Sequence, residues 1–357
     1  MSLVSRTGVA MRYVYGPVPS WRLGRSLGVD LVPAKTCNWN CVYCQLGRTR
    51  PVVNERREFV PAAVVVSEVR SALESLDEGV VEWITILGSG EPLLHSQVGW
   101  IIDSIKRLTP IPVAVITNGS LLCRSEVRQE LLAADAVLPT LDAGTADLFR
   151  RLNRPHPDIT LDRHTEGLAA FREAYTGRLL VEVMLIHGLN VGEPDTAAIA
   201  SRLAGIRPDE IHVNAPKRCP AEPSVRAPDP GLVLSAVSTF ESIALVRRAG
   251  QTGGAFRIDP CEPIVDAVES IVTRHPMTEA ELTRALATSV PERASAAMLE
   301  LERSDRLRVV VWDGTWYWVS TTAYFPEEAD TARRSARLSK GIPLPALDFD
   351  GCTTDDN

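Results

Sequence analysis

Three cysteines near the beginning of the chain carry the clearest chemistry in the sequence. Cys37, Cys41 and Cys44 follow the spacing C-x3-C-x2-C. An iron–sulfur cubane ordinarily takes four thiolate ligands, so three local thiolates leave one iron without a protein ligand. An open coordination position is what a catalytic metal centre requires. The spacing therefore predicts a catalytic four-iron cluster on this segment.

Two other interpretations of the cysteines are a zinc site and a chance group of buried thiols. A structural zinc site is closed by four ligands, and the next histidine, His95, is far downstream. Unrelated cysteines rarely fall at this spacing directly after an expected strand. The other cysteines have no ligand spacing, so we expect buried or free thiols at Cys123, Cys219, Cys261 and Cys352.

Composition places the chain among ordinary globular proteins. Its 357 residues are 45% hydrophobic and 23% charged, which allows a sizeable core and more than one domain. The net charge of −7 provides no global basic field for nucleic acid. No apolar run approaches the roughly 20 residues that span a bilayer, and the first residues do not resemble a secretory signal. Seven cysteines, an odd number, favour a cytosolic metal or redox site over a disulfide framework. We expect a soluble, cytoplasmic protein without membrane contact.

Short β-branched runs alternate with helical patterns from about residue 26 to residue 250. The expected strands are 26–32, 83–87, 113–117, 136–141, 179–186 and 210–214. The expected helices are 61–77, 97–107, 124–133, 161–174, 194–204 and 230–249. Six β–α units in series predict an α/β fold, an open barrel of parallel strands with helices outside. Ligands of such barrels bind at the carboxyl ends of the strands, where the site should form.

The pattern changes after the barrel. Five prolines between residues 216 and 230 indicate an ordered connection, and the glycines of 250–254 indicate a second break. Three helical patterns (264–274, 278–287 and 292–304) then precede two strand-like runs (306–312 and 315–321). Asp313-Gly314 between these runs is a strong hairpin signal. The sequence therefore predicts domains at 1–250 (barrel), 251–261 (linker), 262–321 (winged-helix-like) and 322–357 (peripheral tail).

Charge argues against a nucleic-acid role for the winged-helix-like domain. Residues 262–321 contain ten acidic side chains and six Lys or Arg side chains. A nucleic-acid surface presents clustered positive charge. We therefore favour a protein-contact or substrate-covering role for this domain.

Two motifs follow the second and third expected strands. Gly88-Ser89-Gly90-Glu91-Pro92 follows the second strand, and its glycines let backbone carbonyls approach a ligand closely. Thr117-Asn118-Gly119 ends the third strand, where Thr or Asn can hydrogen-bond ribose hydroxyls. Each pattern also occurs in ordinary turns. Their place at strand ends, where barrel ligands bind, favours the functional interpretation.

The cysteine motif resembles that of the radical S-adenosylmethionine (SAM) superfamily. The stretch of residues 16–30 that leads into it is similar to a branch of iron–sulfur oxidoreductases related to wyosine-base-forming enzymes. The resemblance covers about residues 13–250. It implies a partial, TIM-like (β/α)6 barrel with a [4Fe-4S] cluster and SAM as cofactors. It further implies an electron donor such as flavodoxin or ferredoxin, and a 5′-deoxyadenosyl radical that takes a hydrogen atom from the substrate.

The resemblance also implies roles for individual residues. The cysteines would hold the cluster, and Gly88, Gly90 and Glu91 would form the turn that receives the methionine ammonium of SAM. The usual form of that turn is Gly-Gly-Glu-Pro, and here Ser89 replaces the second glycine. The other residues of the expected SAM site are Tyr43, Thr117, Asn118, Thr140, Asp142, Met184 and Asn214.

Some of these residues have more specific expected positions. Thr140 and Asp142, after the fourth strand, look like the polar pair that contacts SAM or substrate in related enzymes. Met184 is expected to face the barrel interior, because side chains alternate along a strand, although plain core packing would also explain it. Asn214 lies in a segment that resembles the patch packed against adenine, and Tyr43 would pack on the other side.

The function predicted first is that of a radical SAM enzyme acting on an RNA, a peptide or a small molecule. One alternative is a non-catalytic iron–sulfur redox sensor that signals through the winged-helix-like domain, and another is a zinc-stabilised binding module. A sensor needs neither the glycine turn nor the ribose and adenine contacts. The chain has no cysteine before Cys37, whereas the wyosine-forming enzymes are expected to bind a second cluster through upstream cysteines. The substrate therefore stays open.

Overall fold

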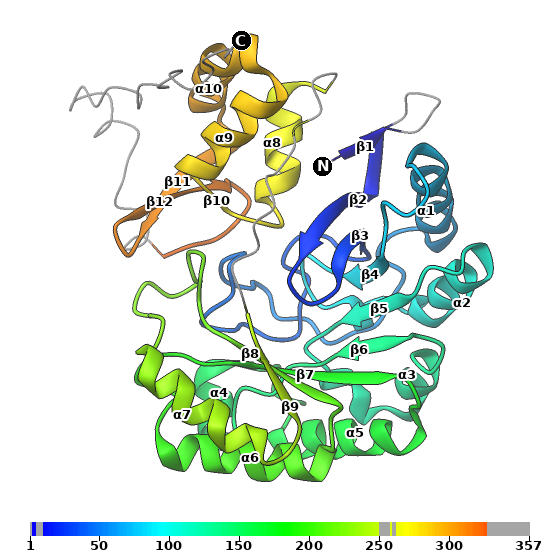
Figure 1. The fold of residues 1–357 in the computed structure, drawn as a ribbon, viewed down its shortest axis with the longest axis vertical. Helices are drawn as coiled ribbons and strands as arrows, with labels where there is room; N and C mark the ends of the chain where they lie inside the picture. Colours follow the sequence, from blue (N-terminus) through cyan, green and yellow to red (C-terminus); the bar gives the residue numbers. More distant parts are fainter. Residues whose placement is uncertain (1, 5–9, 250–257, 259–261, 327–357) are drawn as a thin grey trace, which may run out of the picture.

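The computed structural model describes residues 2–4, 10–249, 258 and 262–326. Within these residues, nine strands form one sheet in the order of the chain (Figure 1). The first three, β1 (Ser2–Val4), β2 (Ala10–Ser20) and β3 (Gly24–Asp30), pair antiparallel. From β3 onward every neighbouring pair is parallel, through β4 (Trp83–Leu87), β5 (Val113–Ile116), β6 (Ala136–Leu138), β7 (Arg178–Met184), β8 (Glu210–Asn214) and β9 (Leu245–Arg248).

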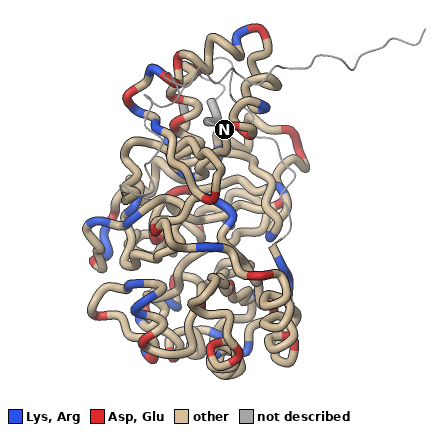
Figure 2. The backbone as a smooth tube through the Cα atoms, turned by 90° about the vertical axis from the view of Figure 1, so that its left-hand side faces the viewer, with Lys and Arg blue, Asp and Glu red and all other residues tan. Residues whose placement is uncertain are grey.

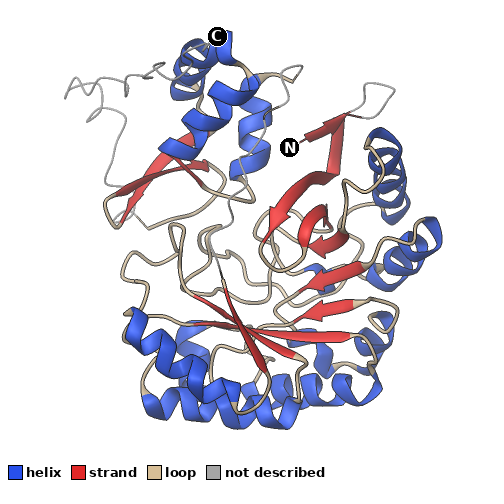
Figure 3. Cartoon of the chain, viewed as in Figure 1, coloured by secondary structure: helices blue, strands red, loops and turns tan. Residues whose placement is uncertain are grey.

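Helices follow the parallel strands and cover the outer side of the curved sheet (Figure 3). They are α1 (Ala62–Ser75), α2 (Val98–Leu108), α3 (Ser125–Glu130), α4 (Ala146–Leu152), α5 (Leu161–Ala174), α6 (Glu193–Ile206) and α7 (Pro230–Glu241). Two short 3-10 helices, η1 (Pro92–Leu94) and η2 (Ser120–Cys123), occupy strand-end loops. Thr145 and Thr160 begin α4 and α5 with side-chain caps, which satisfy otherwise unpaired backbone amides.

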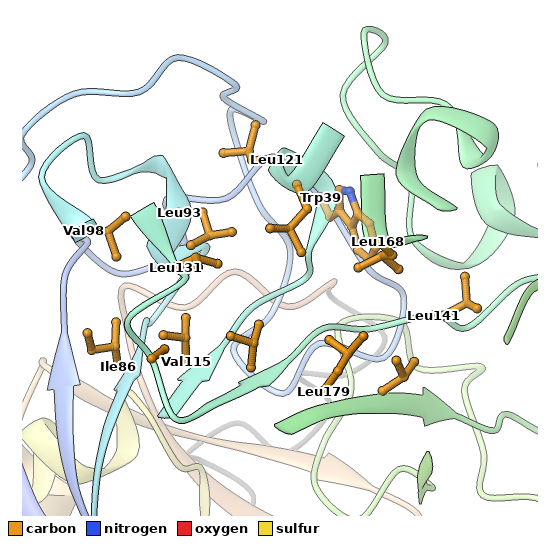
Figure 4. Packing of buried hydrophobic residues seen from close by; sticks show 14 of the residues in the cluster. Trp39, Ile86, Leu93, Val98, Val115, Leu121, Leu131, Leu141, Leu168 and Leu179 are labelled. Atoms are coloured by element: carbon orange, nitrogen blue, oxygen red, sulfur yellow. The ribbon is translucent and has the colours of Figure 1, made fainter. Parts of the chain in front are cut away.

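The main core lies between the sheet and this helical layer. It joins strand residues such as Ile86 and Val115 to helix residues such as Val98 and Leu168 (Figure 4). Trp39 belongs to the same core although it comes from the cysteine segment, and only 1% of its surface is exposed. A side chain of this size buries enough apolar area to anchor the loop that carries it.

The turn between β2 and β3 fills the interior of the open barrel. Leu23, at this turn, is buried in one apolar cluster with residues of β5, β6 and β7, namely Ala114, Ala136, Leu138 and Leu180. The neighbouring Arg22 forms an ion pair with Glu182 on the inner face of β7. The turn thus closes the interior away from the carboxyl ends of the strands.

The six expected strands are all present and parallel, so the predicted α/β fold with a partial barrel is confirmed. The expected helix 230–249 is wrong beyond Glu241, because the chain turns there into the edge strand β9. Strand β2 was not expected, since Gly16-Pro17 and Pro19 interrupt its pattern. The structure accommodates them where the pairing register shifts between Tyr15 and Val18. Strand β1 and helix α4 were also not expected.

Residues 262–326, called the C-terminal region below, contain three helices and a small sheet. The helices are α8 (Ile264–Val272), α9 (Glu279–Ser289) and α10 (Ala294–Arg303), with a 3-10 turn η3 (Pro291–Arg293) before the last. The strands β10 (Met277–Thr278), β11 (Leu307–Trp312) and β12 (Thr315–Ser320) pair antiparallel in the order β10-β12-β11. The three helices and the hairpin lie where the sequence predicts them, whereas β10 was not expected.

The C-terminal region packs against the loop that carries the cysteines and against the loop between β8 and α7. The indole nitrogen of Trp312 donates to the carbonyl of Val225 at 2.9 Å. The carbonyl of Tyr324 accepts from the amide of Arg48 at 2.7 Å, and Phe325 is buried beside Cys219. The first residues of the expected peripheral tail are therefore packed. The rest of that tail with Cys352, and almost all of the expected linker with Cys261, lie outside the described residues.

Two further properties concern the whole described part of the chain. No helix in it combines the length and the apolar character that crossing a membrane requires. Lys and Arg are interspersed with Asp and Glu along the chain, without a continuous basic block (Figure 2).

Candidate functional site

The three cysteines lie in the loop that follows β3, and all three are free, half-buried thiols. The buried Trp39 anchors the loop between Cys37 and Cys41, and its amide lies 3.4 Å from the Cys37 sulfur. The Lys35 ammonium lies 3.0 Å from the Cys44 sulfur. The protein therefore presents three thiols and one cation on a single short loop.

Burial opposes ionisation of these thiols. It raises the pKa of Cys37 to about 12, and the nearby Glu91 carboxylate acts in the same direction. Burial also raises the pKa of Cys41, to which the neighbouring Cys37 and Cys44 contribute. Thiols of this kind become thiolates when they bind a metal, which supplies the opposing positive charge. The donor set fits an iron–sulfur cluster.

Among residues 2–4, 10–249, 258 and 262–326, no three His, Cys, Asp or Glu side chains converge as ligands of a single ion do. In a cubane each thiolate binds a different iron, so the ligands stand apart from one another.

The glycine turn after β4 is joined to the cysteine loop by backbone contacts. The Lys35 amide donates to the Ser89 carbonyl at 2.6 Å, and the Glu91 amide donates to the Thr36 carbonyl at 2.8 Å. A Cβ on Gly90 would lie 1.9 Å from the Thr36 carbonyl oxygen. The turn therefore needs glycine at position 90 to pass directly beneath the cysteine loop.

Ser89, which replaces the usual glycine, has a partner of its own. Its hydroxyl donates to Asp30 Oδ2 at 2.6 Å, and its amide donates to Asp30 Oδ1 at 3.0 Å. Asp30 ends β3 and is buried. Arg274 of the C-terminal region reaches the same carboxylate at 3.1 Å. The serine thus joins the glycine turn to the end of the neighbouring strand.

Glu91 connects the glycine turn to the end of β5. Its carboxylate accepts from the Thr117 hydroxyl at 2.5 Å, the Asn118 amide at 2.7 Å and the Leu93 amide at 3.0 Å. Burial raises the pKa of Glu91 to about 7, although these hydrogen bonds lower it. Asn118 Nδ2 in turn lies 3.8 Å from the Cys37 sulfur. One hydrogen-bonded network therefore runs from the turn to the first cysteine.

A second network forms around Asp142, at the end of β6. The Tyr43 hydroxyl and Asn153 Nδ2, at 2.8 Å, donate to Asp142 Oδ2, and the Met184 amide donates to Oδ1 at 2.8 Å. Burial raises the pKa of Asp142 to about 6 against the effect of these donors. Asn153 Nδ2 also lies 3.7 Å from the Cys41 sulfur. This network therefore reaches the cysteine loop at Cys41.

Thr140, Met184 and Asn214 border the second network. Met184 and Asn214 are register partners at the carboxyl ends of β7 and β8, and both side chains are half-buried. Asn214 Nδ2 donates to Glu182 Oε1 at 3.3 Å. Thr140 forms an isolated bridge to Glu182, and its carbonyl receives a hydrogen bond from the ring of His164.

All the residues that the sequence pointed to thus lie in the cysteine loop or at the carboxyl ends of β4 to β8. Sequence reasoning missed Asp30, Asn153 and Arg274. The place of Asp30 at the end of a parallel strand was an available signal, whereas nothing near Arg274 in the sequence indicates its contact. The surface grooves between α1 and α2 and between α8 and α10 are lined by none of these residues.

Comparison with known proteins gives the family. The family model of the radical SAM superfamily matches residues 31–199. The UPF0026 protein MJ1312 of Methanocaldococcus jannaschii is 33% identical over 272 residues, which cover 75% of this chain and 84% of that protein. The UPF0026 protein slr1464 of Synechocystis is 39% identical over 206 residues, which cover 57% of this chain and 76% of that protein. A solved structure of TYW1 with a lysine-pyruvate adduct bound aligns with a TM-score of 0.48 and 16% identity. The alignment covers 63% of this chain and 76% of that one. The chain therefore belongs to the family of these UPF0026 proteins, and its residues 31–199 form a domain of the radical SAM superfamily.

Proposed function

We propose that this protein is a radical SAM enzyme whose cluster is held by Cys37, Cys41 and Cys44. When bound, a [4Fe-4S] cluster supplies the electron that cleaves SAM to a 5′-deoxyadenosyl radical, which takes a hydrogen atom from the substrate. One observation carries the proposal. Two buried hydrogen-bonded networks, around Glu91 and around Asp142, reach the cysteine loop at two different cysteines, Cys37 and Cys41.

The two networks suit the two ends of SAM. The turn with Gly88, Gly90 and Glu91 would receive the methionine end, because its backbone lies against the start of the cysteine loop. Thr117 and Asn118 would stand between this turn and the ribose. Lys35, beside Cys44, adds a positive charge next to the thiolates that the cluster requires.

The adenosine end would lie on the other side of the loop. Asp142 holds Tyr43 through the phenol hydroxyl, which fixes the ring beside the cysteines. Met184 and Asn214 provide the opposing backbone at the ends of β7 and β8, and Thr140 lies in the loop after β6, bridged to Glu182 of β7. These residues would orient the base and exclude water from the reacting carbon.

The domain assignment belongs to the same proposal. We assign residues 1–250 to the catalytic barrel, 251–261 to a linker, 262–321 to a winged-helix-like domain and 322–357 to a tail. Packing of Trp312 and Tyr324 against the loops at the mouth of the barrel supports a covering role for the C-terminal region. Its excess of acidic residues supports a protein or substrate contact over nucleic acid.

The substrate class is proposed no more narrowly than RNA, peptide or small molecule. The electron donor would be a flavodoxin or a ferredoxin. The protein would act in the cytoplasm.

The test is release of 5′-deoxyadenosine by the anaerobically reconstituted, chemically reduced protein. Iron and sulfide are measured in the same preparation. The enzyme should contain both and should release 5′-deoxyadenosine from SAM. A protein with iron and sulfide that leaves SAM intact would favour the redox sensor, and one with zinc and no sulfide would favour the binding module.

A further inference from the structure

One side chain of the C-terminal region reaches the carboxyl end of β3, beside the proposed SAM turn. The Arg274 Nε lies 3.1 Å from Asp30 Oδ2, and the two side chains are only 17% and 6% exposed. The guanidinium also packs over the ring of Tyr15, at 4.7 Å. That ring lies on Gly28, where a Cβ would come within 2.4 Å of it. Arg274 is therefore held in a built site.

Polar contacts continue from Arg274 to the cysteine loop. Asp30 accepts from Arg274 and from both the hydroxyl and the amide of Ser89. The Ser89 carbonyl accepts the amide of Lys35, and the ammonium of Lys35 lies 3.0 Å from the Cys44 sulfur. Each member contacts the next directly, so the path from the C-terminal region to the cysteines is continuous.

The first step of this path is an ion pair that compensates the buried charge of Asp30. A buried carboxylate is stable as an anion only where a cation and hydrogen-bond donors compensate for the lost water. Arg274 is the basic side chain in contact with Asp30, and Ser89 supplies the other close donors. Without the guanidinium, the buried Asp30 carboxylate would lose its charged partner and turn toward solvent. This change alters the hydrogen bonds that fix Ser89 in the turn.

We propose that Arg274 is a positioning residue for SAM. It holds Asp30, Asp30 holds Ser89, and the glycine turn reaches its SAM-binding conformation only when the C-terminal region is docked. The inference rests on the proposed function, because it requires that this turn receives SAM. It adds that the SAM site is shared between the barrel and the C-terminal region.

The test is the affinity of the cluster-loaded protein for SAM, measured anaerobically by equilibrium binding. In R274Q the side chain keeps polar atoms and loses its charge. We expect R274Q to bind SAM about tenfold more weakly, because a buried carboxylate loses its charged partner. Its iron content should stay close to wild type, whereas its cluster-free form should melt at a lower temperature because the buried carboxylate has lost its partner. SAM affinity is therefore measured well below that melting temperature. Wild-type SAM affinity in R274Q would overturn the proposal.

Two other arginine variants are controls for general effects on the C-terminal region. Arg306 pairs with Asp266 and Glu269 inside that region. Arg218 pairs with Glu281 and so ties the region to the barrel at another place. R306Q and R218Q should bind SAM within about twofold of wild type, the usual scatter for independent sites. Equal weakening in R218Q would mean that docking alone matters and would overturn a specific role for Arg274.

S89A keeps the proposal testable if R274Q loses iron or does not fold. It removes the hydroxyl that donates to Asp30 and leaves both backbone contacts of Ser89 in place. We expect weaker SAM binding in S89A, and in S89A/R274Q, where it folds, an affinity close to that of the weaker single variant. Wild-type affinity in S89A, or fully additive losses, would overturn the path. A wild-type enzyme that does not bind SAM would overturn both this inference and the proposed function. If every variant binds SAM as tightly as wild type, only the role of Arg274 is overturned.

Discussion

A Cβ on Gly90 would lie 1.9 Å from the carbonyl oxygen of Thr36, a backbone atom of the cysteine loop. Because a backbone atom cannot move aside without shifting the loop, G90A should separate the turn from the cysteines. We expect a loss of about 1–3 kcal/mol in the free energy of unfolding, as overpacking typically costs, and a lower iron content after reconstitution. Denaturant titration and iron assay measure the two effects.

The matched control is G205A. Gly205 is an exposed residue of α6, and an added Cβ there would meet no atom within 4 Å. Alanine favours helix over glycine, so G205A should stabilise the protein by up to about 1 kcal/mol. A G90A protein as stable and as rich in iron as G205A would contradict the contact at Thr36.

Glu91 should make the stability of the cluster-free protein depend on pH. Burial raises the pKa of this carboxyl from 4.5 to about 7. Between these values the folded state binds more protons than the unfolded state, so the free energy of unfolding falls as pH rises through this range. The fall should be roughly 3 kcal/mol larger in wild type than in E91Q, which cannot ionise. Denaturant titrations at about pH 5 and about pH 8 measure the difference, and parallel profiles would contradict it.

Replacing Cys37, Cys41 and Cys44 together by alanine should remove the iron and abolish reductive cleavage of SAM. Each thiol contributes one ligand, and no other cysteine of the described chain lies in the loop. C123A is the control, because Cys123 lies in η2 and outside the loop, and its cluster spectrum should match wild type. SAM cleavage by an iron-free triple variant would contradict the proposed mechanism.

The full chain should bind RNA and duplex DNA weakly at physiological salt. In the C-terminal region Arg274 contacts Asp30, Arg306 contacts Asp266 and Glu269, and acidic residues outnumber basic ones. Binding assays at rising salt measure the number of phosphates contacted. Tight binding that falls steeply with salt would contradict a covering role.

Local patterns were sufficient to predict the parts of the site that depend on neighbouring residues. The spacing of the cysteines places the three thiols in one loop. The serial alternation of strands and helices predicts parallel strands, whose carboxyl ends bring the residues after β4, β5 and β6 to one edge of the sheet. The same reasoning failed at β2, where prolines concealed a strand that an irregular register accommodates. It also failed at β9, whose four residues continue a helical pattern.

Contacts across the chain could not be predicted in this way. Ser89 looked like a plain substitution for glycine, and its role became visible only when Asp30 was found beside it. Arg274 lies 244 positions from that carboxylate, and no spacing in the sequence relates the two. Such pairs depend on how the C-terminal region docks, which the shape of both surfaces decides.

The covering of the cysteine loop has a consequence for how the protein is made. Gln45 donates to the carbonyl of Arg274, 229 positions later in the chain, and Arg48 donates to the carbonyl of Tyr324. Translation therefore produces the cysteines before the residues that make both covering contacts. Under the proposed function, iron and sulfide would reach an open loop before these later residues are made. The contact between Arg48 and Tyr324 forms only after residue 324 has left the ribosome. The order of the residues would therefore separate the loading of the cysteines from the enclosure of their loop in time.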